Sequence, residues 1–485
     1  MKNRILFSVL IAALVLFQNH AYSFCGFYVA TAGSKIFNET SQVILVRDGN
    51  SSTITMSNDF KGDVKNFAMV VPVPVVLGAN DITTVNPQVF NTLDNYSGPR
   101  LVEYFDENPC KLKEMANKRF LKRSMAVPMT ALSNEVIESA DDNGVTIEAV
   151  YEVDEYDILI LSAKESEGLK IWLTDNNYEI PESAAEVLDP YIKNNLKFFV
   201  VKVDTDRLAD TGSKTLNPLQ IRFDSPKFML PIRLGMANAQ GAQDMIVYAL
   251  SKEGRIECTN YRTVKVPTDR NIPTFVRNDF GNFYKDLFDR EYDRQGQNCV
   301  FLEYAWNVTP SWGGVKCDPC VGPPPISRDL ASAGVRWNGN VQFTRLHVRY
   351  TKEKFAQDLL FQVTPNKENF QARYIITNPA NGTFNCSDGQ DYLVSLVNRR
   401  ERELDELQVL AGWNPDDRPY YVDGYRGMIK EDSRKNEVAA PLPENGPAQT
   451  PIGKLVFTIL IIVTALSLIG KGIYNHIRPK PQIFN

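Results

Sequence analysis

The chain has 485 residues, of which 43% are hydrophobic and 23% are charged, and this composition excludes an intrinsically disordered protein. The net charge is −5, but residues 1–23 and 451–485 contain six basic residues and no acidic ones. Residues 24–450 therefore carry 47 basic and 58 acidic side chains, a net charge of −11. Such an acidic body argues against nucleic-acid binding, which requires a basic surface.

The N-terminus has the three parts of a secretory signal peptide. Lys2 and Arg4 supply positive charge, residues 5–17 are apolar, and residues 21–23 (AYS) form a cleavage site of the small-x-small type. The apolar run is short for a membrane-spanning helix. We therefore predict a cleaved signal peptide over residues 1–23 rather than an uncleaved anchor.

The first part of the body, residues 24–135, is predicted to be rich in strands. Apolar and β-branched runs are separated there by turn residues such as those at 48–50. In the run FAMVVPVPVV at 67–76, Pro72 and Pro74 cannot donate to a ladder, which predicts an edge strand or an extended wall. The expected elements are strands at 42–47, 53–56, 67–76 and 100–105, a short helix at 87–93, and a helix followed by a loop over 111–133.

Residues 136–412 are predicted to form the α+β remainder of this body. A strand–helix–helix–strand unit comes first, an antiparallel meander over residues 219–266 follows, and a long helix with one apolar face closes the region. The expected strands are 145–153, 157–162, 197–203, 219–223, 228–234, 245–250, 255–266, 300–306, 341–350 and 370–376, and the expected helices are 166–175, 181–194, 279–290 and 391–411.

The C-terminal region is predicted to tether the body to a membrane. Residues 413–451 form a polar, Pro-rich stalk, and the uncharged run Leu455–Ile469 follows. Its 15 residues span only about 22 Å as a helix, so we place the transmembrane helix at 452–474, where flanking residues lengthen it toward the core thickness of about 30 Å. The basic tail, residues 475–485, is predicted to be cytoplasmic by the positive-inside rule.

All seven cysteines follow the predicted cleavage site, in a compartment where disulfides form. Candidate disulfide residues are Cys25, Cys110, Cys317 and Cys320, but the sequence does not fix the connectivity, and an odd count leaves one cysteine free. Lipidation of Cys25 is disfavoured because the bulky Phe24 precedes it.

The stretch around Cys317 and Cys320 is the most unusual of the chain. A Cys-x-x-Cys pair can form a redox dithiol, half of a zinc site or a structural disulfide. The redox interpretation requires a helix directly after the pair, but prolines follow at 323–325, and a zinc site requires further cysteine or histidine ligands nearby. The pattern favours a structural disulfide, with redox chemistry as the alternative.

The body contains a single histidine, His347, which lies in a predicted strand on the same face as Arg345 and Arg349. Without a second histidine it is interpreted as a strand residue with satisfied hydrogen bonds rather than as a base or ligand. Carboxylate pairs occur at 141–142, 154–155 and 416–417, all in contexts typical of solvated turns. The sequence predicts no cofactor or metal site.

The chain resembles DUF2330, a bacterial family of unknown function, over most of residues 24–380. The resemblance implies an exported protein, commonly membrane-tethered, with no established activity, and it transfers no catalytic residues. It is carried by these segments: CGFYVA (25–30), SQVILVRDG (41–49), FAMVVPVPVVL (67–77), RLVEYFD (100–106), YDILILSAKES (156–166), SPKFMLPIRLG (225–235), TNYRTVKVP (259–267), FLEYAW (301–306), CDPC (317–320) and TRLHVRY (344–350).

These observations predict an α+β body, rich in antiparallel sheet with a few packed helices, plus one C-terminal transmembrane helix. The expected location is the outer, periplasmic side of the bacterial cytoplasmic membrane, with the bilayer itself contacted through Leu455–Ile469. The favoured function is non-catalytic binding of an envelope protein or glycan, or support of assembly. The alternatives are a thiol–disulfide oxidoreductase that uses Cys317 and Cys320, and an envelope hydrolase with paired carboxylates.

Overall fold

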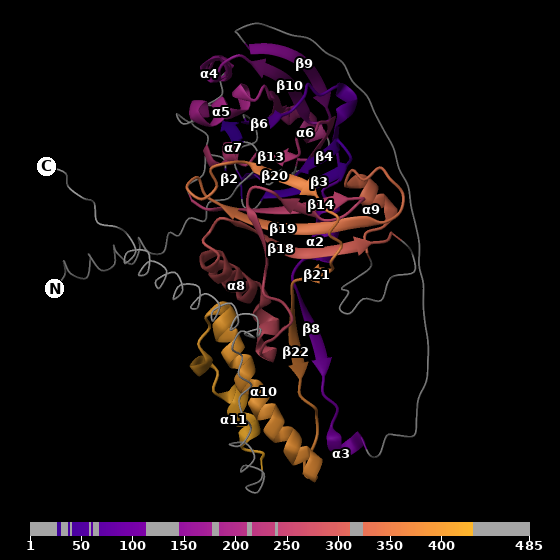
Figure 1. Ribbon diagram of the computed structural model, residues 1–485, viewed down its shortest axis with the longest axis vertical. Helices are drawn as coiled ribbons and strands as arrows, with labels where there is room; N and C mark the ends of the chain where they lie inside the picture. The colour runs from indigo at the N-terminus through magenta and orange to yellow at the C-terminus, as the bar shows by residue number, and fades with distance from the viewer. Residues whose placement is uncertain are drawn as a thin grey trace, which may run out of the picture.

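The computed structural model is arranged in three tiers along its longest axis (Figure 1). A small sheet with helices lies at one end, a large sheet crosses the middle, and a helical tier with a parallel sheet lies at the other end. The residues that the structure describes are 27–30, 37–38, 41–57, 60–61, 67–112, 145–176, 184–210, 216–237, 241–310 and 324–429.

The first tier is a five-stranded antiparallel sheet covered on one face by two helices. Helices α4 (Ser166–Asp175) and α5 (Ala184–Lys193) press Leu169, Trp172 and Leu188 against the sheet. The strand order is β1 (Phe27–Ala30), β6 (Phe67–Val73), β11 (Lys197–Val203), β10 (Tyr156–Ala163) and β9 (Val145–Val153).

The second tier is a nine-stranded mixed sheet, mostly antiparallel, with parallel pairs at β16·β18 and β3·β14. Along the main path the order is β16 (Arg262–Lys265), β18 (Cys299–Val308), β19 (Val341–Tyr350), β14 (Gln243–Ser251), β3 (Ser41–Asp48), β4 (Ser51–Met56), β12 (Leu219–Asp224) and β7 (Ile82–Thr84), and β21 (Phe370–Gln371) pairs with β18. Gly49, with φ of +55°, supports the tight turn between β3 and β4 that the sequence predicts.

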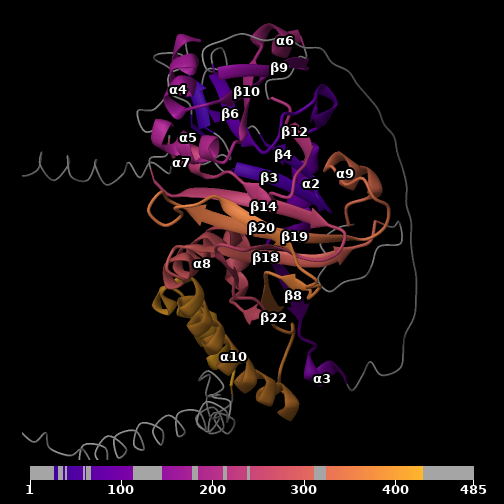
Figure 2. The same ribbon diagram turned by 45° about the horizontal axis from the view of Figure 1, so that its top comes forward.

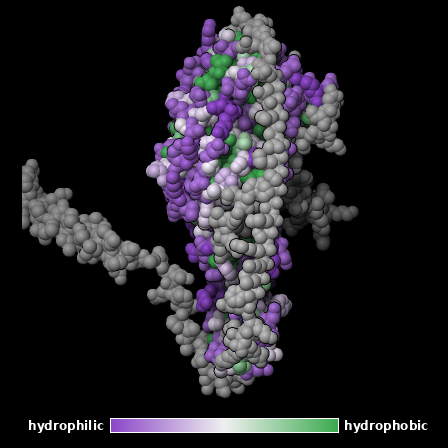
Figure 3. Space-filling view, turned by 90° about the vertical axis from the view of Figure 1, so that its right-hand side faces the viewer, coloured by the Kyte–Doolittle hydropathy of each residue, from purple (hydrophilic) through white to green (hydrophobic). Residues whose placement is uncertain are grey.

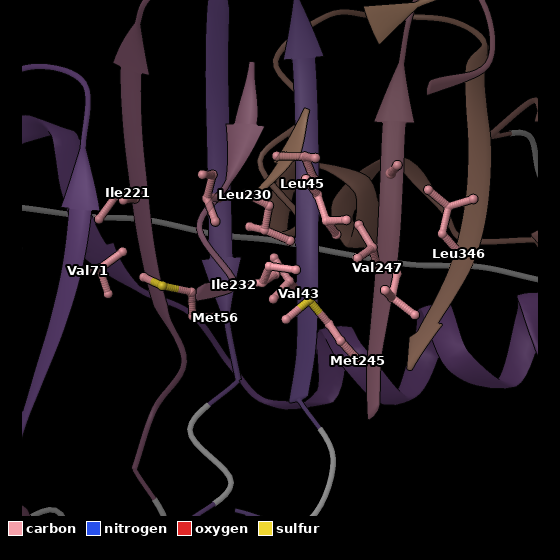
Figure 4. Close-up of a cluster of buried hydrophobic side chains, with 14 of the residues drawn as sticks. Val43, Leu45, Met56, Val71, Ile221, Leu230, Ile232, Met245, Val247 and Leu346 are labelled. Carbon is pink, nitrogen blue, oxygen red and sulfur yellow. The ribbon is translucent and has the colours of Figure 1, made fainter. Parts of the chain in front are cut away.

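The largest core lies between these two sheets. Val43 of β3, Val247 of β14 and Val71 of β6 belong to this one core and are each at most 3% exposed. Figure 4 shows Val71 beside Ile221 and Met56, while Val43 and Val247 lie farther along the large sheet. The opposite face of the large sheet is covered by α2 (Gln88–Ser97) and α9 (Ser327–Ser332), whose apolar residues form a second core with β14 and β19. Because both faces are buried, the central strands read as nearly continuous apolar runs.

The third tier consists of α8 (Phe280–Arg294), α10 (Ser387–Ala411) and α11 (Tyr420–Arg426) beside a parallel three-stranded sheet (Figure 2). That sheet has the order β17 (Arg270–Asn271), β22 (Arg373–Asn378) and β8 (Arg100–Phe105).

The remaining elements are short. They are the sheet β13 (Met229–Leu230), β20 (Leu359–Val363) and β15 (Ile256–Cys258), the pair β2 (Phe37–Asn38) and β5 (Phe60–Lys61), the helices α3 (Pro109–Leu112), α6 (Thr205–Asp210) and α7 (Arg233–Ala237), and the 3₁₀ turns η2 (Ala79–Asp81), η3 (Thr274–Asp279) and η4 (Pro415–Asp417).

The predicted fold class, α+β with antiparallel-rich sheets and few helices, is confirmed, but three local predictions are wrong. First, β6 is not an edge strand, because β1 and β11 flank it. Pro72 lies beyond Val70, the last residue paired with β1, so its missing N–H removes no bond on that side.

Second, residues 219–266 do not form a meander. β12 pairs with β4 and β7, whereas β14 pairs with β3 and β19, so strands that follow one another in the sequence separate in space. Only Met229–Leu230 of the expected strand at 228–234 is extended, and α7 begins at Arg233.

Third, residues 415–429 do not begin the stalk. They form η4 and α11, which pack on α10 and bury Val422 and Ile429. The rest of the predicted stalk, the transmembrane helix at 452–474 and the signal peptide at 1–23 lie outside the described residues. Among the residues described, no helix is both long enough and apolar enough to cross a bilayer.

Candidate functional site

Three basic side chains of β19 project from one face of the large sheet, where they contact α2 and α8. Arg345, His347 and Arg349 occupy alternate positions, so they share a face as the sequence predicts. Asp244 on β14 lies directly opposite Arg349. Glu303 sits in a bulge of β18, where the register with β19 shifts between Leu302 and Tyr304. The bulge gives Glu303 a position outside the regular alternation, and its carboxylate lies between Arg345 and His347.

These residues join Asp94 of α2 and Asp289 of α8 in one continuous chain of contacts, which we call the ionic row. Arg345 binds both Asp94 and Glu303, His347 bridges Glu303 and Asp244, and Arg349 binds both Asp244 and Asp289. The distances are 2.5 Å from Arg345 Nη1 to Asp94 Oδ1, 2.6 Å from Arg345 Nε to Glu303 Oε2, 2.9 Å from His347 Nδ1 to Glu303 Oε1, 3.1 Å from His347 Nε2 to Asp244 Oδ1, 2.8 Å from Arg349 Nη2 to Asp244 Oδ2, and 2.5 Å from Arg349 Nη1 to Asp289 Oδ1.

The row keeps its central groups charged despite their burial. Burial alone would lower the pKa of His347, but the Glu303 carboxylate and the hydrogen bond with Asp244 raise that pKa above its ordinary value. Burial alone would raise the pKa of Glu303, but Arg345 and then His347 lower it to about 2. The pKa of Asp244 is likewise lowered, because hydrogen bonds from His347 and Arg349 outweigh its burial.

Both ring nitrogens of His347 lie within hydrogen-bond distance of carboxylates, and only the protonated ring can donate to both at once. A base needs a free lone pair on nitrogen, and a protonated ring has none. Phe288 of α8 also covers one face of the ring, with the two ring centroids 3.8 Å apart and the planes 12° apart. The row connects α2 and α8 to the sheet, and it engages both ring nitrogens of His347.

A second buried charge cluster lies between α10 and α11. Arg400 and Glu403 are each 1% exposed and form an ion pair of 2.7 Å from Nη1 to Oε2. Burial raises the pKa of Glu403 to about 7, against the lowering effect of Arg400 and Arg399. The hydroxyl of Tyr421 hydrogen-bonds both Glu403 and Arg400, which attaches α11 to the long helix.

Of the four predicted disulfide residues, Cys110 is bonded, and its partner is Cys386. The bond joins α3 to the N-cap of α10 across 276 residues of sequence. Cys25, Cys317 and Cys320 lie outside the described residues. Among the cysteines described, Cys258 and Cys299 are free thiols, and burial raises the pKa of each.

The carboxylate pairs singled out from the sequence lie in short turns wherever the structure describes them. Glu155 is fully buried in the turn between β9 and β10 and accepts the backbone N–H of Asn217 at 2.6 Å, which is a structural role. Asp416 and Asp417 are in η4, and residues 141–142 lie outside the described residues. Within the described ranges, no group of three or more His, Cys, Asp and Glu side chains could hold a metal ion.

Sequence reasoning missed the acidic half of the ionic row. Glu303 lies within VFLEYAW, where a lone charge in an apolar strand was the available signal. Asp94 and Asp289 lie on the polar sides of helices and carry no such signal, because only the packing of α2 and α8 onto the sheet brings them near Arg345 and Arg349. Glu403 lies within a run of alternating charges in α10. Such a run is typical of a solvated helix face, so the sequence provides no sign that Glu403 is buried.

Comparison with known proteins yields a match to one family. Residues 19–362 match the family described as "Uncharacterized protein conserved in bacteria (DUF2330)". No curated protein and no solved structure is significantly similar to the chain.

Proposed function

We propose that this chain, which belongs to the DUF2330 family of uncharacterized bacterial proteins, is a membrane-tethered envelope protein whose acidic body binds a partner without catalysis. The observation that carries the location is the disulfide between Cys110 and Cys386. Disulfides that join distant parts of a chain are typical of exported proteins and rare in the cytosol.

The membrane topology that we propose is based on the sequence. It places the body in an oxidising compartment, where the disulfide can form. A signal peptide over 1–23 exports the chain, the run Leu455–Ile469 stops transfer, and the basic tail 475–485 stays in the cytoplasm. The described chain ends at Ile429, so a stalk of about twenty residues would separate α11 from the bilayer.

A binding role is supported by the chemistry of the most polar buried site. The ionic row pairs each of its charged groups with another, and its only histidine has both nitrogens engaged. The coloured part of the surface in Figure 3 is mostly hydrophilic, with apolar residues in small separate patches. Single exposed apolar side chains, such as Phe105 at 73% and Tyr420 at 86% exposed, offer contacts for a partner.

Deletion of residues 452–485 tests the location. We expect the truncated protein to appear in the soluble periplasmic fraction with the Cys110–Cys386 bond formed, whereas a variant without residues 1–23 remains in the cytoplasm with both thiols reduced. A truncated protein that stays with the membrane fraction would contradict the tether.

Photo-crosslinking residues placed at Phe105 and Tyr420 in living cells test the binding role. We expect adducts of discrete mass at these positions and none at the exposed Lys352, which serves as the control. The same yield at all three positions, or at none, would contradict a specific binding surface.

A further inference from the structure

A cavity of about 440 Å³ lies between α9 and the loop that follows it, beside the large sheet (Figure 1). Leu330 of α9 and Val335 of the loop are buried and form an apolar wall, and the partly buried Trp337 lines the same space. Gln220 of β12 and Arg336 of the loop add polar groups. This volume lies within the range of small-molecule sites in proteins.

The loop after α9 is held in place by hydrogen bonds. Gly334, with φ of +102°, ends the helix, and the N–H of Val335 donates to the carbonyl of Leu330 at 2.9 Å. The Nε1–H of Trp337 donates to the carbonyl of Asn340 at 3.1 Å. The indole is therefore positioned at the cavity before any ligand enters, which reduces the conformational entropy that binding costs.

Gln220 presents a fixed hydrogen-bond acceptor to this cavity. The residue is 7% exposed, and its Nε2 donates to Oγ1 of Thr55 at 2.8 Å and to the carbonyl of Ser332 at 3.0 Å. Because a carbonyl only accepts, Ser332 fixes the orientation of the amide. Oε1 has no hydrogen-bond partner within the described part of the chain, and it is not one of the unpaired atoms that are sealed from solvent. Its accessible surface therefore faces the cavity that Gln220 lines.

The described residues that line the cavity include one cation and no carboxylate, although the body as a whole is acidic. Arg336 is exposed, and its guanidinium has no ion-pair or hydrogen-bond partner within the described ranges. The side chain of Asn338, which also lines the cavity, is exposed and forms no hydrogen bond in the same ranges. A free guanidinium can bind a carboxylate through two parallel hydrogen bonds.

Solvation by water accounts for each of these groups taken singly. Exposed arginines are common on protein surfaces, and water can donate to an accessible amide oxygen. Water does not account for their combination, in which a fixed acceptor, an indole and an unpaired guanidinium share one cavity with an apolar wall. A ligand that has both hydroxyl groups and an apolar face would replace the water with gain at each of these groups.

We infer that this cavity binds an acidic saccharide, a pyranose ring that carries a carboxylate. A ring hydroxyl would donate to Oε1 of Gln220, and the carboxylate would pair with Arg336. The C–H face of the ring would pack on Trp337, because the face of an aromatic ring is partially negative and the C–H groups of a sugar are partially positive.

The inference deepens the binding role proposed above and rests on it only for its biological setting. Titration of the purified protein can fail while the crosslinks at Phe105 and Tyr420 succeed, and the reverse also holds. The two proposals are therefore tested separately.

Ligand-observed NMR titration of the purified full-length chain, in a detergent whose head group is not a sugar, tests the site. Glucuronate carries both the ring hydroxyls and the carboxylate, and glucose lacks the carboxylate. Cyclohexanecarboxylate keeps a six-membered ring and the carboxylate but has no ring hydroxyls. We expect saturable binding of glucuronate, binding of glucose that is about tenfold weaker, equivalent to about 1.4 kcal/mol, and no saturable binding of cyclohexanecarboxylate.

Two variants and one matched control assign the contacts. Arg336→Gln should weaken glucuronate binding about tenfold and leave glucose binding unchanged. Gln220→Met keeps the length of the side chain but removes the acceptor, so it should weaken the binding of both sugars. Arg328→Gln removes another exposed arginine, which belongs to α9 and does not line the cavity, and it should bind both sugars as the wild type does.

Gln220→Met also removes the two hydrogen bonds from Nε2, so its melting temperature is measured beside its affinity. If that variant does not fold, the comparison of Arg336→Gln with Arg328→Gln still decides the assignment, because both positions are exposed.

Four results would overturn the inference. The first three are the absence of saturable glucuronate binding, equal affinity for glucuronate and cyclohexanecarboxylate, and equal affinity for glucuronate and glucose. The fourth is an equal loss of affinity in Arg328→Gln and Arg336→Gln, which would reduce the effect to general electrostatic attraction.

Discussion

At the residue scale, the placement of Glu303 decides the chemistry of the largest polar cluster. A regular strand would point successive side chains of β18 to opposite faces, but the bulge changes this alternation at one residue. The 1%-exposed carboxylate gains Arg345, His347 and the hydroxyl of Tyr284 as partners. Its pKa of about 2 and the raised pKa of His347 are two consequences of the same contacts.

His347→Gln is expected to destabilise the body in a pH-dependent way. The pKa of His347 is higher in the folded than in the unfolded state, so its stabilising effect is fully present below the unfolded pKa of about 6.5 and is lost as pH rises through the folded pKa. Urea unfolding at pH 6 should show a loss of about 3 kcal/mol relative to the wild type, because the buried Glu303 and the half-buried Asp244 lose their shared cation. At pH 9 the loss should be smaller.

Leu346→Ala is the control for this measurement. Leu346 is fully buried on the opposite face of β19 and carries no charge, so its destabilisation should be the same at both pH values. A loss in His347→Gln that is equally independent of pH would show that the histidine acts through packing on Phe288 alone.

At the element scale, α10 is attached at its N-terminus and near its middle by different means. Its N-cap residue Cys386 is bonded to Cys110, and its C-terminal half carries the Arg400–Glu403 pair beneath α11. Gly389 lies so close to the disulfide that an added Cβ would be 2.7 Å from the Cys110 sulfur. The first turn of α10 therefore fits against α3 only with glycine at this position.

Cys386→Ala is expected to lower the free energy of unfolding by about 2 to 4 kcal/mol, because the bond restricts the unfolded chain across a long loop. Denaturant unfolding under oxidising conditions measures this loss. Cys110→Ala and the double variant should lose the same amount, since each removes one bond. A double variant much less stable than either single variant would show that the thiols stabilise the protein independently of the bond.

At the scale of the whole molecule, the sheets combine early and late parts of the chain. β3 pairs with β14, β6 with β11 and β8 with β22, so strands from before residue 113 belong to the same sheets as strands from after residue 144. The two predicted parts of the body, 24–135 and 136–412, therefore fold together and do not form separate domains.

Fragments 24–128 and 129–485, expressed together, are expected to co-purify because of this interleaving. Cys110→Ala in the first fragment ensures that no disulfide holds the pair together. Size-exclusion chromatography should give one complex of the combined mass, and fragment 24–128 alone should aggregate, because the apolar strands β3, β4 and β6 lose their partners. A soluble, folded fragment 24–128 in isolation would contradict the interleaved fold.

The sequence by itself determined most individual elements of the described chain. Alternation predicted β9 and β19 with their observed bounds, and apolar periodicity predicted α4 and most of α10, because these local patterns depend on backbone geometry alone. The shared face of Arg345, His347 and Arg349 followed from the same period of two.

Only the tertiary structure decided which strands pair and which charges meet. Strands that follow one another in a sequence commonly pair, so residues 219–266 suggested a meander. In the structure β14 instead lies between β3 and β19, in a sheet with both faces buried. Asp94, Glu303 and Asp244 come from three elements far apart in sequence, so no spacing rule could place them beside β19.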